Sequence, residues 1–206
     1  MNMLMPLGEP APPISDEQQE ALGKVAETIS EKATDAFSKL LGSKVSAKVP
    51  DLEVLPLSEA VDRLGSPGEQ VTAAWLPVVG QIEASVLLLF DPAGEKQIYD
   101  VLGLEPYTEM ARSALQEMAN IIGTQYVFGI ADSCGLTFEP EPPEVSEGML
   151  GAVLSTVLAM STVVTNYAVL VDTQLTVESS DCVVRFLFIP SDTSVEALIE
   201  NIGKDA

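Results

Sequence analysis

Three polar side chains recur at helical spacing in the mostly apolar segment 110–130. Ser113, Glu117 and Asn120 stand at positions i, i+4 and i+7, and residues three or four apart are neighbours on one face of a helix. Pro143 follows Asn120 after 22 intervening residues. The stripe therefore brings together a hydroxyl, a carboxylate and a carboxamide, and a carboxamide can accept one hydrogen bond from a water molecule while donating another.

Other common catalytic sets are absent from the sequence. The chain contains no histidine, which excludes Ser-His-Asp and Cys-His catalysis, histidine-ligated metals and a histidine general base. Cys134 and Cys182 are the two cysteines, and neither belongs to a C-x-x-C motif. We expect two reduced, buried thiols, although the spacing alone leaves a disulfide open.

Charge and hydropathy restrict the partners. With 10 basic against 31 acidic residues and a formal net charge of −21, the chain is a poor ligand for nucleic acid or for an acidic membrane surface. Residues 1–14 lack Lys and Arg and are rich in proline, so we expect a disordered tail and no signal peptide. The uncharged segment 148–171 is diluted by Ser, Thr and Asn, which favours a buried helix followed by a strand over a membrane span.

Two long helices must position these residues. Ser15 and Thr108 are typical N-caps, and Ser15 with Gln18 forms a capping box. The pattern predicts helices over 16–41 and 109–134, which end at Gly42 and Gly135.

A shift of 93 positions superimposes the two helices. It places Leu22 on Leu115, Ile29 on Ile122 and Pro50 on Pro143. In both halves, a strand, a helix, two strands and a short helix are expected to follow. The expected strands are 44–49, 71–79 and 82–90, then 136–140, 163–177 and 182–189, and the expected helices are 58–64, 93–102, 146–160 and 193–202.

The repeat predicts an α+β fold. We expect one domain over 15–206, made of a first half (15–104) and a second half (105–206) with the order α-β-α-β-β-α. The segment 140–144 is rich in proline and is predicted to be a rigid connector. Gly123 and Gly129 inside the second helix are expected to allow close packing.

The three polar residues and the proline together resemble a known signature. Ser113, Glu117, Asn120 and Pro143 match the Ser/Asp-x3-Glu-x2-Asn-x22-Pro motif of the CheC, CheX and FliY family, phosphatases that act on the chemotaxis response regulator CheY. The resemblance covers nearly the whole chain after residue 14 and is strongest to CheC-like members. It implies pseudo-two-fold symmetry, with the two long helices side by side on one continuous sheet.

The resemblance also implies a role for each residue. Asn120 would position the attacking water at an aspartyl phosphate, and Glu117 would pair with the lysine beside that phosphate in the regulator. Ser113 would add a hydrogen bond, and Pro143 would fix a loop against the helix. The protein would need no cofactor of its own, because Mg²⁺ would be held by the partner.

The corresponding positions of the first helix carry different chemistry. Glu20, Lys24 and Glu27 replace the serine, glutamate and asparagine, while Pro50 keeps the proline. Lys24 has the charge opposite to the motif glutamate. We therefore interpret the first site as degenerate and expect one working site.

Several alternatives compete with a cytoplasmic chemotaxis phosphatase. The polar stripe could be an ordinary solvated helix face. A CheC-like protein without catalysis could recognise a phosphorylated regulator or CheD, the receptor deamidase that the resemblance implies as a partner. A FliY-like switch component is the third possibility. Monomer and homodimer both stay open.

Overall fold

The computed structural model describes residues 15–47, 51–160, 167–177 and 180–201. This part of the chain folds into helices and antiparallel strands, as the α+β prediction requires. In chain order the elements are α1 (Asp16–Leu41), β1 (Val45–Ala47), β2 (Asp51–Pro56), α2 (Leu57–Leu64), β3 (Gln70–Gly80), β4 (Ala84–Phe90), α3 (Pro92–Leu102), α4 (Glu109–Cys134), β5 (Phe138–Pro140), β6 (Glu144–Met149), α5 (Leu150–Met160), β7 (Tyr167–Val177), β8 (Ser180–Pro190) and α6 (Asp192–Asn201).

The two long helices begin and end where their caps predict. At α1, the Ser15 hydroxyl accepts from the Gln18 amide at 3.2 Å, and the Ser15 amide donates to the Gln18 side chain at 2.9 Å. At α4, the Thr108 hydroxyl accepts from the Ala111 backbone amide at 3.2 Å. Both helices end at a left-handed glycine, Gly42 with φ 62° and Gly135 with φ 60°. These local interactions confirm the predicted bounds.

The strands form one antiparallel sheet. Its path runs β1-β7-β8-β4-β3-β5, with β2 also paired to β7 and β6 also paired to β3. Each half therefore places its first two strands beside a strand of the other half, and the β4–β8 pair joins the halves at the centre. If each strand is replaced by its counterpart in the other half, the strand order read from one end of the sheet equals the order read from the other end. The single sheet is confirmed, whereas descent from a duplication stays a prediction.

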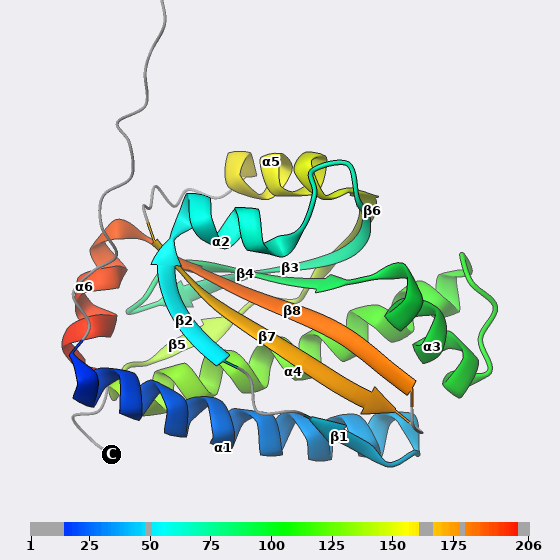
Figure 1. Cartoon of the computed structure of the whole chain (residues 1–206), viewed down its shortest axis with the longest axis horizontal. Coiled ribbons are helices and arrows are strands. Elements are labelled where there is room, and N and C mark those ends of the chain that lie inside the picture. Colours follow the sequence, from blue (N-terminus) through cyan, green and yellow to red (C-terminus); the bar gives the residue numbers. More distant parts are fainter. Residues whose placement is uncertain (1–14, 48–50, 161–166, 178–179, 202–206) are drawn as a thin grey trace, which may run out of the picture.

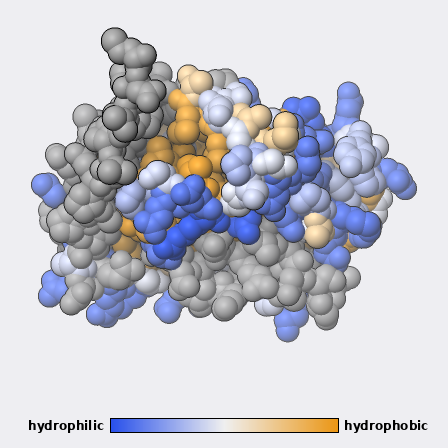
Figure 2. Space-filling model, turned by 45° about the horizontal axis from the view of Figure 1, so that its top comes forward, coloured by the Kyte–Doolittle hydropathy of each residue, from blue (hydrophilic) through white to orange (hydrophobic). Residues whose placement is uncertain are grey.

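Helices cover both faces of this sheet (Figure 1). The long helices α1 and α4 lie side by side on one face, with α3 at one end and α6 at the other. The opposite face carries α2 and α5 over a second core cluster. With that side turned forward, a hydrophobic area is seen with hydrophilic residues to its right and below (Figure 2). The sheet thus anchors the long helices by their inner faces and leaves their outer faces accessible.

Two short strands were missed by the sequence prediction. No element was predicted where β2 lies, and β6 covers the end of the predicted connector and the start of a predicted helix. Each half therefore has the order α-β-β-α-β-β-α. α5 begins at Leu150 and not at Ser146. In β6 only Val145 is buried, so neither an alternating nor a continuous apolar pattern marks the strand. Its pairing with β3, far away in sequence, determines its structure.

Further predictions concerned a membrane span, the two cysteines and the N-terminal segment. No helix within them is long and apolar enough to cross a membrane. The segment 148–171 contains the end of β6, the helix α5 and the start of β7, with 161–166 outside the description. Cys134 is a free, buried thiol, while the side chain of Cys182 lies outside the described residues. Residues 1–14 and Pro50 lie outside them as well.

Candidate functional site

Helix α4 is held firmly against the sheet. Its inner face buries Leu115, Met118, Ala119 and Ile122. Gly123 is buried, and a Cβ there would come within 2.7 Å of a Leu76 methyl group. Close approach at this glycine, as predicted, fixes the height of α4 above the sheet.

The three motif residues lie on the opposite, outer face of α4. Ser113 and Glu117 are exposed and Asn120 is half-buried. Among the described hydrogen bonds, none uses the Glu117 carboxylate or the Asn120 carboxamide. A site on this face requires that a partner can reach the Asn120 side chain. Its partial exposure meets that requirement, whereas burial in the core would not.

Pro143 is brought to the same helix through neighbours that the sequence analysis did not select. The proline is buried, and its carbonyl accepts from the Gln116 side chain at 2.7 Å. One turn earlier, the Arg112 guanidinium donates to the Val145 carbonyl at 2.6 Å. Gln116 and Arg112 therefore tie the start of β6 to α4, directly beside the motif stripe. Only their i, i+4 spacing was visible in the sequence, and that spacing does not indicate a contact.

Exposed apolar side chains flank the motif. Met110, one turn before Ser113, is 69% exposed, and Phe128, two turns after Asn120, is 45% exposed. Both positions fall on the same helical stripe as the motif. Single exposed apolar side chains are common on soluble proteins, so these two residues extend the stripe without marking a contact surface by themselves. We call Met110, Ser113, Glu117, Asn120 and Phe128 the α4 face.

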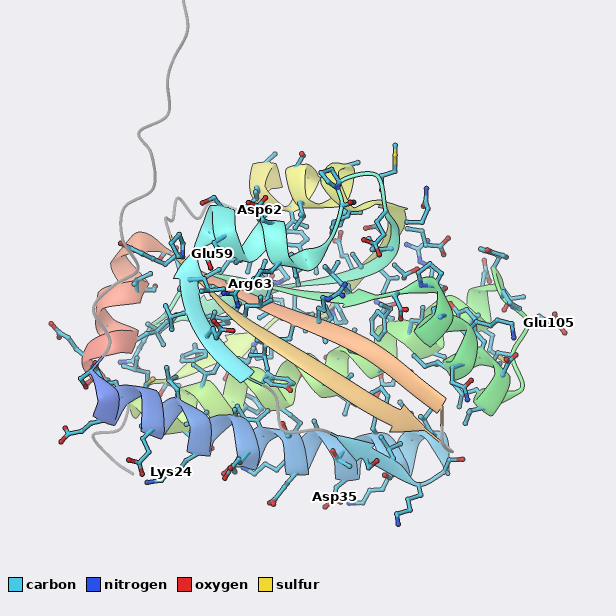
Figure 3. All side chains as sticks on the ribbon, in the orientation of Figure 1. Lys24, Asp35, Glu59, Asp62, Arg63 and Glu105 are labelled. Carbon is cyan, nitrogen blue, oxygen red and sulfur yellow. The ribbon has the colours of Figure 1, made fainter. Side chains whose placement is uncertain are left out.

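The corresponding surface of α1 is almost entirely acidic. Glu20 and Lys24 form an exposed i, i+4 ion pair at 3.0 Å, and Lys24 lies on α1 at the edge of the molecule (Figure 3). Glu27 is exposed. The 93-residue shift places acidic or basic residues opposite every member of the α4 face. We call this set the α1 face: Glu17, Glu20, Lys24, Glu27 and Asp35.

Other polar clusters have structural explanations. Glu95 accepts from the Thr72 hydroxyl at 2.7 Å and from the Tyr99 hydroxyl at 2.6 Å. Burial and the hydrogen bond to Glu95, one turn earlier on α3, raise the pKa of Tyr99, so this hydroxyl stays protonated. The Thr72 hydroxyl of β3 joins the sheet to α3 through Glu95. Burial also raises the pKa of the Cys134 thiol, which makes it a poor nucleophile. Among the described residues, no group of three or more acidic or cysteine side chains could hold a metal ion.

The sequence matches a family model at the segment that carries the site. Residues 110–147, which include all four motif positions, match the CheC-like family. The chain is also 29% identical over 200 residues to the CheY-P phosphatase CheC of Bacillus subtilis (strain 168), and the match covers 92% of this chain and 96% of that protein. The chain is therefore similar to CheC-like proteins, over most of its length in the comparison with the Bacillus subtilis protein.

Further similar proteins were found by sequence and by fold. CheC1 of Halobacterium salinarum is 27% identical over 126 residues, or 58% of this chain and 62% of that protein. The crystal structure of Thermotoga maritima FliY superimposes with a TM-score of 0.71 at 16% identity, over 94% of this chain and 99% of that one. The FliM middle domain from H. pylori gives 0.69 at 11% identity, over 92% and 100%. At such identities the structural matches establish the fold alone.

Proposed function

We propose that this protein stimulates hydrolysis of the aspartyl phosphate on a CheY-like response regulator, through a single site on the α4 face. The observation that carries the proposal is the intact Ser113-Glu117-Asn120 stripe, accessible on the outer side of α4 and absent from α1. The identity to a CheY-P phosphatase across most of the chain supports the same activity. The protein would act in the cytoplasm, where the regulator is found.

Asn120 would place the water that attacks the phosphoryl group. Its carbonyl oxygen accepts a hydrogen bond from the water, and its amide donates toward a phosphoryl oxygen. The water oxygen forms a bond to phosphorus while the bond to the aspartyl oxygen breaks. The freed carboxylate takes the electron pair, and the water proton passes to solvent. Positioning is the main requirement in such a reaction, which fits a site without a general base.

Glu117 and Ser113 would hold the regulator in place. A carboxylate that meets a lysine ammonium in a desolvated interface forms a strong, directional bond, and the family resemblance supplies such a lysine beside the phosphoaspartate. Ser113, one turn earlier, would add a hydrogen bond at the edge. Pro143 would not react: buried and bonded to Gln116, it fixes the loop that abuts α4.

The apolar ends of the α4 face would add contact area. Met110 and Phe128 lie on either side of the polar stripe and are exposed, so a partner that covers Asn120 would bury both. Water would then be excluded around the Glu117 ion pair, which strengthens it. In this proposal Mg²⁺ is bound by acidic residues of the regulator, and this chain contributes no ligand to it.

The test is the decay rate of CheY phosphorylated with a small-molecule phosphodonor. The native protein should accelerate decay, Asn120→Ala should lose on the order of 100-fold of the acceleration, and Glu117→Ala a similar amount. Lys24→Ala, at the position equivalent to Glu117, is the matched control and should retain full activity. Unchanged decay in the presence of native protein would contradict the proposal.

Binding measurements separate this activity from the alternative function. If the native protein binds phosphorylated CheY or CheD without changing the decay rate, the chain is a CheC-like binding protein that lacks catalysis. Lys24 and Glu27 stand in the first half where the motif has glutamate and asparagine. Because one half of this chain lacks the motif, a protein that binds without catalysis is the alternative to test.

A further inference from the structure

A hollow lies beside the acidic side of α1, away from the α4 face. It has a volume of about 540 Å³ and opens between the middle of α1 and the strand β1. Volumes of this size are typical of small-ligand sites. We call it the α1 groove, and its lining residues are Glu27, Ser30, Glu31, Thr34, Asp35, Val45 and Ser46.

A buried hydroxyl without a partner lines this groove. Ser30 is 4% exposed, and its side-chain oxygen forms no hydrogen bond. The neighbouring Thr34 hydroxyl is already used, because it donates to the Ser30 carbonyl at 2.6 Å. Leaving a buried hydroxyl unpaired costs free energy, and a ligand that donates a hydrogen bond to it would recover that cost.

Three carboxylates follow the groove along the helix. Glu27, Glu31 and Asp35 recur every four residues, which corresponds to a rise of about 6 Å from one to the next. None of them takes part in an ion pair within the described part of the chain, whereas Lys24 is bound to Glu20. In a chain of net charge −21, this row is a strongly negative, uncompensated surface.

We propose that the α1 groove binds a primary ammonium group on a slender alkyl chain, as in a linear polyamine. An ammonium group has three donors and no acceptor, which matches two carboxylates and the Ser30 hydroxyl. A polyamine repeats this cation along its length, so successive groups can meet Glu27, Glu31 and Asp35. The described residues show no cluster that fits a metal ion.

The same chemistry is available from a lysine side chain of a protein, and the ligand source can be distinguished experimentally. Spermidine and a lysine-containing peptide are titrated separately by calorimetry at physiological ionic strength, with Mg²⁺ as the comparison cation. Saturable binding of either amine, tighter than that of Mg²⁺, supports the ammonium site and identifies its source. Equal weak binding of all three would mean only a counterion atmosphere and would overturn the proposal.

Variants locate the site. Glu31→Gln should weaken amine binding roughly tenfold, as expected for loss of one charge-assisted hydrogen bond. Ser30→Ala should weaken binding severalfold yet melt at the same or a higher temperature, because it removes an unpaired hydroxyl. Glu17→Gln loses the same charge on the same helix outside the groove and should bind normally. Equal effects of Glu17→Gln and Glu31→Gln would contradict a defined site.

This inference is independent of the phosphatase proposal. The Asn120→Ala variant should bind the amine with unchanged affinity, since Asn120 lies on α4. Loss of amine binding in Asn120→Ala would contradict a separate α1 site, whatever the result of the decay assay.

Discussion

α1 and α4 are two helices of the same length with opposite outer surfaces. Each has 26 residues, a hydroxyl N-cap and a left-handed glycine at its end. Leu22 and Leu115 are buried at corresponding positions, as are Ile29 and Ile122. On the outside, α4 carries the polar motif between Met110 and Phe128, whereas α1 carries mainly carboxylates. The inner faces are alike because they pack against the same sheet, whereas the outer faces differ, as the proposed single site requires.

The inner faces should respond alike to truncation. Leu22→Ala and Leu115→Ala each remove a buried side chain, 4% and 1% exposed, from the same core cluster. Each should lower the free energy of unfolding by about 2–5 kcal/mol, measured by urea denaturation. A loss confined to one of the two helices would break the equivalence of their buried faces.

The crossing of the two helices should tolerate no added volume on α4. A Cβ at Gly129 would overlap the Ile29 side chain of α1, so Gly129→Ala should lower the free energy of unfolding by about 1–3 kcal/mol. Gly23→Ala, in open space on α1, is the matched control and should stabilise the protein by up to about 1 kcal/mol. Stabilisation by both variants would show that the helices separate easily.

The apolar ends of the α4 face should affect affinity more than catalysis. Phe128→Ser and Met110→Ser should each weaken binding of the phosphorylated regulator, Phe128→Ser by about tenfold and Met110→Ser by less, because part of the contact area is lost. The decay rate at saturating protein should change little. Concentration series in the decay assay separate the two quantities. A fall in the saturated rate with unchanged affinity would place these residues in a different role.

The long helices could be predicted because their signals are local. Ser15 and Thr108 cap their own first turns, and Gly42 and Gly135 supply the left-handed conformation that ends each helix. The position of Ser113, Glu117 and Asn120 on one outer face followed from spacing alone. The inner face could be predicted from the apolar residues that recur between these polar positions.

The missed features depend on contacts between distant segments. β6 is a strand because it pairs with β3, although its own residues are mostly exposed and polar. The bond from Gln116 to the Pro143 carbonyl spans 27 positions, and no local pattern indicates it. The α1 groove depends on the distance between α1 and β1, so Ser30 could not be distinguished from an ordinary core serine by sequence.

In the proposed function, Asn120 performs catalysis and does not merely contribute to binding. The most direct measurement compares native protein and Asn120→Ala for the saturated decay rate of phosphorylated CheY and for affinity toward it. If Asn120 positions the attacking water, the saturated rate of Asn120→Ala should be lower on the order of 100-fold, with affinity nearly unchanged. A saturated rate equal to that of the native protein would contradict it.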